Sequence, residues 1–498
     1  MKAIRGLLAV AAFVLPGLSH AQSGAAHLTV TDEIVNIKGK QVAFMMIKND
    51  EDGSQGYSPN QSDGFAVAIS NQLGVPTSIH WHGLILPNSM DGVPFVTQNP
   101  IQPGEMIPYA FPLQQAGTYW MHSHYGLQEQ RLNSAPLVIW SEEEKAKADV
   151  QHVVMLSDFT FTPSAKVLVT LKAGMSMRGG MKEMKPKPVA LVTQAWDEAS
   201  GKFTRKEGEG APPDIDVKYD ALLANRHTTD DPDVVTAKPG QTVLLRLIAA
   251  SSATDFFVDT GKLDAELLAV DGQPVEPLKG NFFQLAIAQR LDLRVTIPEG
   301  GGAFPILFQG EGTKLQAAVV IKTEDAKTPR IASEAGTLAG GLDNTQEKLL
   351  RAPKALEAKP VDKSFPIELG GDMAKYVWTI NGKAYPNRDS LDVKLGERVE
   401  FVMTNKTTMG HPMHLHGHVF QVTEIDGQPV SGALRDTVEV PPGSTIKIAF
   451  DANNPGIWAF HCHILYHMAT GMFTVLKYEG ADTSLWQPEK TFTEFLNL

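Results

Sequence analysis

A glycine followed by apolar residues three, five and seven positions later recurs at four places along the chain. The four stretches are PGEMIPYAF (103–111), PGQTVLLRL (239–247), LGERVEFVM (395–403) and PGSTIKIAF (442–450). Each predicts a turn that leads into a half-buried strand, because alternate residues of a strand face the same side. Long helical patterns are scarce, and 43 glycines and 32 prolines interrupt the chain. The pattern therefore predicts an all-β protein built from sandwich or barrel domains.

Two of these repeats continue in the same way. A glycine follows six residues after Phe111 and six residues after Phe450, and two histidines follow 11 and 13 residues after each of these phenylalanines. Upstream of each repeat lies a further histidine pair, in HWHG (80–83) and in HLHG (414–417). The first and last thirds of the chain are therefore predicted to be copies of one module. The middle third keeps the strand repeat, but its two histidines, His152 and His227, are unpaired and are predicted to be structural.

The module boundaries follow from these repeats and from composition. We predict a first module at 22–142, a second at 143–330 and a third at 365–498. Residues 331–364 are rich in Ala, Lys, Glu and Gly and are predicted to form a connector.

The first 21 residues have the pattern of a secretory signal peptide. Lys2 and Arg5 precede a mostly apolar run at 6–19, and small residues at Ser19 and Ala21 predict cleavage after Ala21. The run is shorter than the roughly 20 residues of a membrane-spanning helix. We therefore expect an exported protein with no membrane span, in the periplasm or, alternatively, outside the cell. The net charge of −12 argues against a nucleic-acid partner.

Four His-x-His pairs carry the candidate chemistry. Residues two apart on a strand point to the same side, so each pair can direct two imidazoles at one place. Imidazole is a good ligand for zinc, copper, iron and nickel. The pairs therefore predict a metal cluster between the first and third modules, and they are His80/His82, His122/His124, His414/His416 and His461/His463.

Cys462 is the only cysteine, and it lies between His461 and His463. In an extended segment its side chain points away from both histidines, so it can bind a metal on its own side. His411, His467 and Met472 lie nearby in sequence. Two histidines, one cysteine and a weak methionine are the ligands of a blue-copper electron-transfer site.

The motifs HWHG, HSH, HPMHLHGH and HCHILYHMATGM resemble the four copper-binding motifs of the three-domain multicopper oxidases, the laccase family. GLQEQ (126–130) makes the chain most similar to the periplasmic copper-resistance oxidases of that family. The resemblance implies three consecutive cupredoxin-like Greek-key domains and four coppers. It assigns His411, Cys462, His467 and axial Met472 to the type 1 copper, and His80 and His414 to the type 2 copper. It assigns His82, His122 and His461 to one type 3 copper, and His124, His416 and His463 to the other.

The resemblance also implies the reaction. A donor gives single electrons at the type 1 copper, and they pass from Cys462 through its two histidine neighbours to the cluster, where O2 becomes water. Asp91, in MDG after the first pair, is a candidate proton relay. Some relatives carry a second relay, a glutamate, where this chain has Tyr466, so no second relay is predicted.

The expected donors are phenols, aromatic amines, Cu(I) or Fe(II). One alternative is a dedicated cuprous oxidase for copper resistance rather than a general laccase. A copper carrier would need only the type 1 ligands, and copper nitrite reductases use fewer histidines, so both are disfavoured. Segment 171–188 holds Met175, Met177, Met181 and Met184 among glycines and charges, which predicts a loop or frayed helix that collects Cu(I). The alternative is that these methionines fill gaps in the core.

Overall fold

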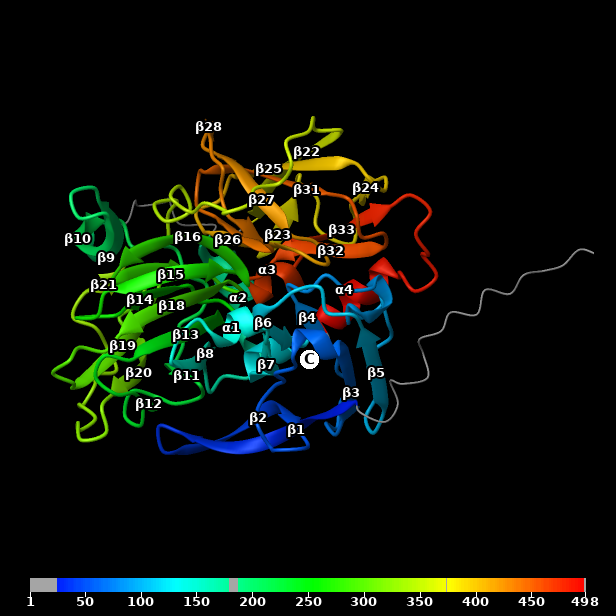
Figure 1. Cartoon of the computed structure of the whole chain (residues 1–498). Coiled ribbons are helices and arrows are strands. Elements are labelled where there is room, and N and C mark those ends of the chain that lie inside the picture. Colours follow the sequence, from blue (N-terminus) through cyan, green and yellow to red (C-terminus); the bar gives the residue numbers. More distant parts are fainter. Residues whose placement is uncertain (1–24, 179–186, 373, 497–498) are drawn as a thin grey trace, which may run out of the picture.

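The computed structural model describes residues 25–178, 187–372 and 374–496 (Figure 1). The predicted signal peptide and cleavage site lie outside these residues, as do Met181 and Met184. Within the described ranges, no helix has both the length and the apolar character needed to cross a membrane.

Strands of the N-terminal unit form a four-stranded and a three-stranded sheet. In the first sheet, β1 pairs antiparallel with β2 and parallel with β3. Its order is β2-β1-β3-β5, with β1 (Ala26–Ile37), β2 (Lys40–Asn49), β3 (Phe65–Asn71) and β5 (Met106–Phe111). The second sheet has the order β4-β6-β7, with β4 (His80–His82), β6 (Gly117–His122) and β7 (Ser134–Ile139).

The middle unit has a nine-stranded and a five-stranded sheet. The order of the first is β11-β8-β13-β18-β15-β16-β10-β9-β21, with β8 (Val150–Phe159), β9 (Val189–Asp197), β10 (Lys202–Gly210), β11 (Ala221–Ala224), β13 (Thr242–Ala249), β15 (Ala265–Val270), β16 (Gln273–Gly280), β18 (Arg290–Thr296) and β21 (Leu338–Ala339). The order of the second is β12-β20-β19-β14-β17, with β12 (Asp233–Thr236), β14 (Phe256–Asp259), β17 (Phe282–Leu285), β19 (Ala303–Gly310) and β20 (Gln316–Lys322). Strand β21 lies inside the segment predicted to be a connector and pairs with β9.

The C-terminal unit is a further pair of sheets, one of seven strands and one of five. The order of the first is β23-β22-β25-β31-β27-β28, with β29 beside β27; its strands are β22 (Lys363–Asp372), β23 (Val377–Ile380), β25 (Arg398–Asn405), β27 (Phe420–Ile425), β28 (Gln428–Pro429), β29 (Leu434–Arg435) and β31 (Thr445–Asp451). The order of the second is β24-β33-β32-β26-β30, with β24 (Leu391–Val393), β26 (His411–Leu415), β30 (Thr437–Val440), β32 (Ile457–Cys462) and β33 (Phe473–Tyr478).

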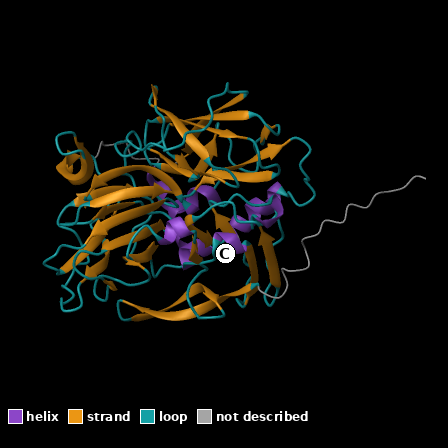
Figure 2. Ribbon diagram, in the orientation of Figure 1, coloured by secondary structure: helices purple, strands orange, loops and turns teal. Residues whose placement is uncertain are grey.

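Helices are short and lie mainly between the sheets (Figure 2). They are α1 (Glu142–Lys145), α2 (Ser164–Arg178), α3 (Leu465–Ala469), α4 (Pro488–Leu496) and the 3-10 turns η1 (Gln61–Asp63), η2 (Asn88–Met90) and η3 (Gln128–Arg131). The prediction of an all-β protein is confirmed. Met175 and Met177 lie in α2, so this part of the predicted loop or frayed helix is helical.

The four glycine-led repeats form strands β5, β13, β25 and β31. Their glycines have φ values between 74° and 92°, a left-handed conformation that glycine adopts without a steric penalty. Burial alternates along β5, β25 and β31 as predicted. The prediction of a half-buried strand is wrong for β13, in which only Thr242 is not buried. Strand β13 lies inside the nine-stranded sheet, and its Arg246 pairs with Glu144 and Asp292 on the side that would otherwise face water.

Candidate metal centre

Strand pairing brings the histidine pairs together in the same way in the N-terminal and C-terminal units. His80 is opposite His122 in the β4–β6 ladder, and His414 is opposite His461 in the β26–β32 ladder. His124 lies two residues after the end of β6, and His463 follows directly after β32. All eight side chains are at most 2 % exposed. The repeat detected in the sequence therefore places two equivalent ladders against one buried space between the two units.

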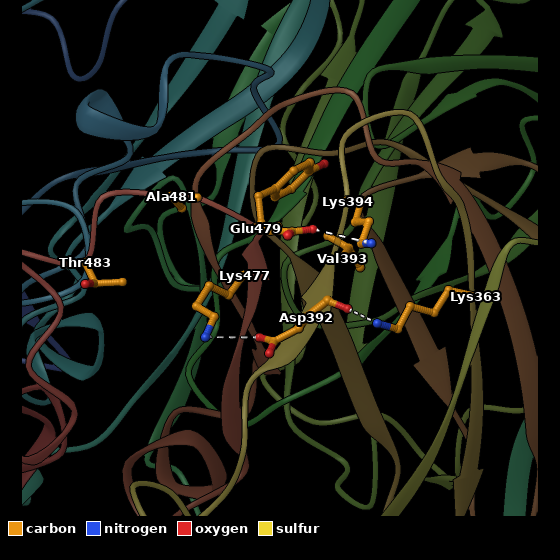
Figure 3. A pocket seen from close by; sticks show the side chains of 10 residues that line it. Lys363, Asp392, Val393, Lys394, Lys477, Glu479, Ala481 and Thr483 are labelled. Carbon is orange, nitrogen blue, oxygen red and sulfur yellow. Dashed lines mark hydrogen bonds and ion pairs between the residues drawn. The ribbon is translucent and has the colours of Figure 1, made fainter.

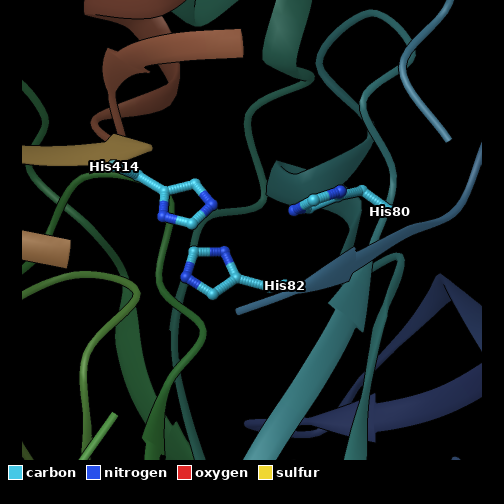
Figure 4. Close-up of side chains that lie close together, drawn as sticks. All are labelled: His80, His82 and His414. Atoms are coloured by element: carbon cyan, nitrogen blue, oxygen red, sulfur yellow. The ribbon is translucent and has the colours of Figure 1, made fainter. Parts of the chain in front are cut away.

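Three sets of histidines have ring nitrogens within 4.8 Å of one another. The sets are His80/His82/His414, His80/His124/His416 and His82/His122/His463. In the first set, shown in Figure 4, the rings of His80 and His82 lie beside the ring of His414. Every set combines histidines from both ends of the chain, so the site exists only where the two units meet.

The grouping differs from the one implied by the resemblance. His463, rather than His461, lies with His82 and His122. The Nε2 atom of His461 lies 3.1 Å from Nε2 of His416. His461 is held opposite His414 by strand pairing, whereas His463, two residues further along an extended segment, reaches the far side of the cluster.

The unpartnered ring nitrogens of these histidines point to metal binding. The Nδ1 atoms of His80 and His414 lie 2.8 Å from the carbonyl oxygens of Asp91 and Asp436. Their Nε2 atoms are buried without a hydrogen-bond partner in the described part of the chain. His82 is reversed: its Nε2 lies 3.1 Å from Asp436 Oδ1, and its Nδ1 has no such partner among the described residues. Buried ring nitrogens of this kind carry the free lone pairs that a metal ion needs as ligands.

Burial also favours the neutral form of six of these imidazoles by lowering their pKa. It lowers the pKa of His82, His124, His414, His416 and His463 well below the usual value of 6.5. It lowers the pKa of His461 to about 3. Neutral imidazoles can donate lone pairs to a cation at physiological pH, so the donor set fits copper.

A fourth set contains His411, Cys462 and His467, all fully buried. Cys462 Sγ lies 3.6 Å from His411 Nδ1 and 3.7 Å from His467 Nδ1. Burial raises the pKa of the Cys462 thiol, so a thiolate here needs a cation beside it. The Cys462 N–H donates to the carbonyl of Met472, which is buried in the same core. A sulfur and two imidazoles at these distances fit a blue copper.

Three buried carboxylates surround the eight histidines. Asp91 Oδ2 lies 3.0 Å from His416 Nδ1, and its Oδ1 lies 3.2 Å from His80 Nδ1. Asp436 lies beside His82, and Glu129 lies 3.1 Å from His122. Sequence reasoning identified Asp91 and missed the other two. Glu129 stands in GLQEQ, five residues after His124, and its position in that motif was the only available signal.

Asp216 is a further residue that the sequence did not indicate. Its Oδ2 accepts a hydrogen bond from His467 Nε2 at 2.9 Å and a second one from the Tyr376 hydroxyl. Ile215, Val217 and Tyr219, from the same loop, line a cleft of about 390 Å³. The loop that forms one wall of this cleft therefore also reaches the outer ring edge of His467.

Another cleft, of about 390 Å³, is lined by residues of the C-terminal unit (Figure 3). Its charges neutralise one another: Lys477 lies 3.3 Å from Asp392, and Lys394 lies 3.6 Å from Glu479. None of the predicted site residues lines it. The two histidines of the middle unit are hydrogen-bonded, His152 to Asp233 at 2.7 Å and His227 to the Asp231 carbonyl at 3.0 Å.

Comparisons with known proteins agree with this geometry. Three family models, each described as multicopper oxidase, match residues 29–144, 151–326 and 359–482. The chain is 34 % identical over 418 residues to multicopper oxidase MmcO of Mycobacterium tuberculosis, which covers 84 % of this chain and 79 % of that protein. It is 27 % identical to a copper resistance protein A homolog of Pseudomonas syringae pv. tomato, over 93 % and 94 % of the two chains.

Solved structures show the same fold. The structure of Fet3p, a multicopper oxidase that functions in iron import, superimposes with a TM-score of 0.73 at 21 % identity, over 94 % of this chain and 93 % of that one. A multi-copper oxidase from Pseudomonas thermotolerans superimposes with a TM-score of 0.66 at 25 % identity, over 91 % and 98 % of the two chains. The three successive sheet pairs are therefore the cupredoxin-like domains expected from the motifs.

Proposed function

The chain belongs to the three-domain multicopper oxidases, and we propose that its His411–Cys462–His467 set takes electrons from phenols, aromatic amines, Cu(I) or Fe(II). Its four coppers, one type 1, one type 2 and two type 3, couple one-electron oxidation of donors to four-electron reduction of O2 to water. The proposal concerns which residues hold these coppers and which donors reach them.

We assign the ligands by the sets that lie together. His411, Cys462 and His467, with Met472 as the axial residue, would hold the type 1 copper. His80 and His414 would hold the type 2 copper. His82, His122 and His463 would hold one type 3 copper, and His124, His416 and His461 would hold the other. The short distances within the His82/His122/His463 and His411/Cys462/His467 sets, the contact of His416 with His461 and the unpartnered ring nitrogens support this assignment.

The observation that carries the proposal is the position of Cys462 on β32. Its sulfur lies beside His411 and His467, while its two chain neighbours belong to the histidine cluster. The backbone of three consecutive residues thus joins a soft thiolate site to the site of oxygen chemistry. A protein that only carries copper would need the Cys462 site alone. A histidine cluster that reduces oxygen needs a neighbouring site that supplies electrons, and the Cys462 site can do this.

Asp216 suits the donor end of this path. A carboxylate hydrogen-bonded to His467 can accept the proton that a phenol loses on oxidation, and it attracts a metal cation. Asp214 lies on the same loop and accepts a hydrogen bond from Thr408 at 3.0 Å. The donor is proposed to bind in the cleft lined by Ile215, Val217 and Tyr219, so that its electron enters through the Asp216–His467 contact.

Asp91 suits the oxygen end. Its carboxylate contacts His80, which is proposed as a type 2 ligand, and His416, which is proposed as a type 3 ligand. The Asp91 side chain is fully buried. Reduction of O2 to water consumes four protons, and a carboxylate at hydrogen-bonding distance can hold or pass them. We propose that Asp91 orients both rings and relays protons at this point.

A second candidate function is that of a dedicated cuprous oxidase, whose electron donor is Cu(I). The two carboxylates Asp214 and Asp216 on the donor loop favour cationic donors, and two of the relatives are copper resistance proteins A. A bound Cu(I) at Met175, Met177, Met181 and Met184 would feed this activity. The side chains of these methionines lie outside the described residues, so the site stays a prediction.

We propose export of the protein on the basis of the signal-peptide pattern alone. The periplasm is the preferred location, and the outside of the cell is the alternative. Oxidation of reduced copper outside the cytoplasm would suit a copper-resistance role.

One experiment separates these possibilities. Turnover of a substituted phenol, Cu(I) and Fe(II) is compared in a single copper-loaded preparation, with oxygen uptake as the common readout. The same comparison is made after all four methionines are replaced by leucine. A general phenol oxidase keeps its phenol rate and shows no selective loss with Cu(I), whereas a cuprous oxidase loses Cu(I) turnover selectively.

A further inference from the structure

Glu129 is a buried carboxylate that faces two histidines of the cluster. It lies in η3, is 5 % exposed, and its Oε1 is 3.1 Å from His122 Nδ1. Its Oε2 is 3.9 Å from His463 Nδ1. His122 comes from the N-terminal unit and His463 from the C-terminal unit, and both belong to the set completed by His82. One carboxylate therefore faces two histidines of a single set, and these two histidines come from opposite sides of the domain interface.

The flanking glutamines hold the Glu129 turn in place. Gln128 Oε1 accepts hydrogen bonds from Thr77 at 2.7 Å and Ser123 at 2.8 Å. Gln130 Oε1 accepts hydrogen bonds from the hydroxyls of Tyr219, Ser252 and Tyr466 at 2.9 to 3.0 Å. Because both neighbours are fixed, the carboxylate between them has a fixed direction, as a group that orients metal ligands requires.

Asp91 and Asp436 show the same arrangement on the other sets. Asp91 contacts His80 and His416, and Asp436 contacts His82 and His414. Each of the three carboxylates thus faces one histidine from each end of the chain. Asp436 has Arg290 as a cationic partner at 2.8 Å. In the described ranges, the ionic contacts of Glu129 are with His122 and His463 alone.

The orientation of these rings leaves Nε2 free for a metal. The Nδ1–H of His122 donates to the Ser123 carbonyl at 3.1 Å, and Glu129 Oε1 lies at the same distance from this nitrogen. The Nε2 atoms of His122 and His463 are buried and unpartnered in the part of the chain that the structure describes. Acceptors at His122 Nδ1 fix the proton there, so the lone pair of that ring lies on Nε2. His463 Nδ1 has no hydrogen-bond partner within the described ranges, and Glu129 lies 3.9 Å from it.

We propose that Glu129 is a positioning residue of the copper cluster: its carboxylate favours the Nδ1–H form of His122 and, by its charge, keeps the Nδ1 edge of the His463 ring turned toward it across the domain interface. The inference rests on the proposed ligand assignment. Glu129 is the second carboxylate of the N-terminal unit beside the cluster, after Asp91, in a chain that has Tyr466 at the position before the last type 1 histidine.

The test compares Glu129→Gln, Glu129→Asp and Glu129→Leu with the parent chain, and uses Glu144→Gln as a control. Glu144 is also a buried carboxylate, but its partners are Arg246 and Lys147 and not a histidine. Copper is withdrawn from the purified full-length protein with a chelator, and copper content is followed together with the blue absorption of the Cys462 site.

In Glu129→Gln and Glu129→Leu, we expect about 10- to 100-fold weaker retention of cluster copper. We expect unchanged blue absorption, a smaller loss in Glu129→Asp, and retention like the parent in Glu144→Gln. In copper-free protein, nitrogen NMR of labelled histidines should show the Nδ1–H form of His122 in the parent and a mixture in Glu129→Leu.

Two outcomes overturn different statements. If the parent retains four coppers and Glu129→Gln retains them equally tightly, Glu129 has no positioning role. If the parent itself binds only the blue copper, the ligand assignment fails first. Should Glu129→Leu not fold, the nearly isosteric glutamine variant still decides the matter.

Discussion

Asp216 of the middle unit and His467 of the C-terminal unit share a hydrogen bond of 2.9 Å, although they are 251 positions apart in the sequence. The bond is made by Nε2 of His467, and Nδ1 of the same ring lies beside Cys462. The imidazole therefore has one edge at the proposed copper and the other at a carboxylate of a different domain. The indole of Trp378 covers the face of this ring, with 3.7 Å between ring centroids. The Asp216 edge is therefore the entry point proposed for electrons.

Replacement of Asp216 by alanine should slow the reduction of the blue copper by phenols and by Cu(I), by about 10- to 100-fold. The carboxylate no longer accepts the phenol proton or attracts the metal cation. Anaerobic stopped-flow measurement of bleaching of the blue band gives this rate, and reoxidation by O2 should keep the parent rate. Equal slowing of both half-reactions would show that Asp216 acts on the whole domain interface instead.

Cys462→Ser should remove both the blue colour and turnover, while copper remains in the histidine cluster. Cys462 is the only thiol in the chain, and serine offers no soft ligand. Copper content and the visible spectrum together test this expectation. A variant that remained blue would exclude Cys462 as a ligand.

Asp91→Asn should slow oxygen reduction by about 10- to 100-fold, and reduction of the blue copper much less. The amide can occupy the same space beside His80 and His416, but it cannot accept a proton. Separate measurement of the two half-reactions distinguishes this result from a general loss of folding. Equal effects on both would argue against a relay.

Met472→Leu should raise the reduction potential of the blue copper and keep its colour. A weak axial thioether donates electron density and favours the oxidised ion, and leucine removes this donation. A redox titration monitored in the visible range gives the potential. An unchanged or lower potential would remove Met472 from the ligand set.

Asp255→Asn should stabilise the protein most above pH 7 and clearly less near pH 5. Burial raises the pKa of Asp255 from 3.8 to about 7, and its Oδ1 accepts a hydrogen bond from the Ile287 N–H. Between pH 3.8 and 7 the folded state therefore binds a proton that the unfolded state has lost, so stability falls as pH rises through this range. The neutral amide avoids the loss, which is on the order of 4 kcal/mol over the whole range.

Chemical denaturation at pH 5 and pH 8 checks this expectation, with Asp264→Asn as an exposed control. A stability gain of equal size at both pH values would show that Asp255 is not titrating.

Local spacing in the sequence was sufficient for the strands and the histidine pairs. The glycine-led repeats predicted β5, β25 and β31 because a positive φ and alternating burial are properties of a few consecutive residues. For β13 the same pattern was insufficient, because its second face is covered by Glu144 of α1 and Thr118 of β6, which contact Arg246.

The surroundings of the histidines could not be predicted in the same way. Whether His461 or His463 lies with His82 depends on how the N-terminal and C-terminal units pack. The sequence spacing does not distinguish these two histidines. Asp436 and Asp216 reach the site from segments without a metal-binding pattern. Their roles arise from tertiary contacts alone.

The cross-domain composition of the histidine sets has a consequence for how the enzyme is made. Every set in the cluster needs a residue from the first quarter of the chain and one from its last hundred residues. A chain whose synthesis stops early therefore cannot assemble any of these three sets, however well its first domain folds. Oxygen chemistry begins only after the last strands have closed on the first, so an unfinished chain cannot release partly reduced oxygen from an incomplete centre.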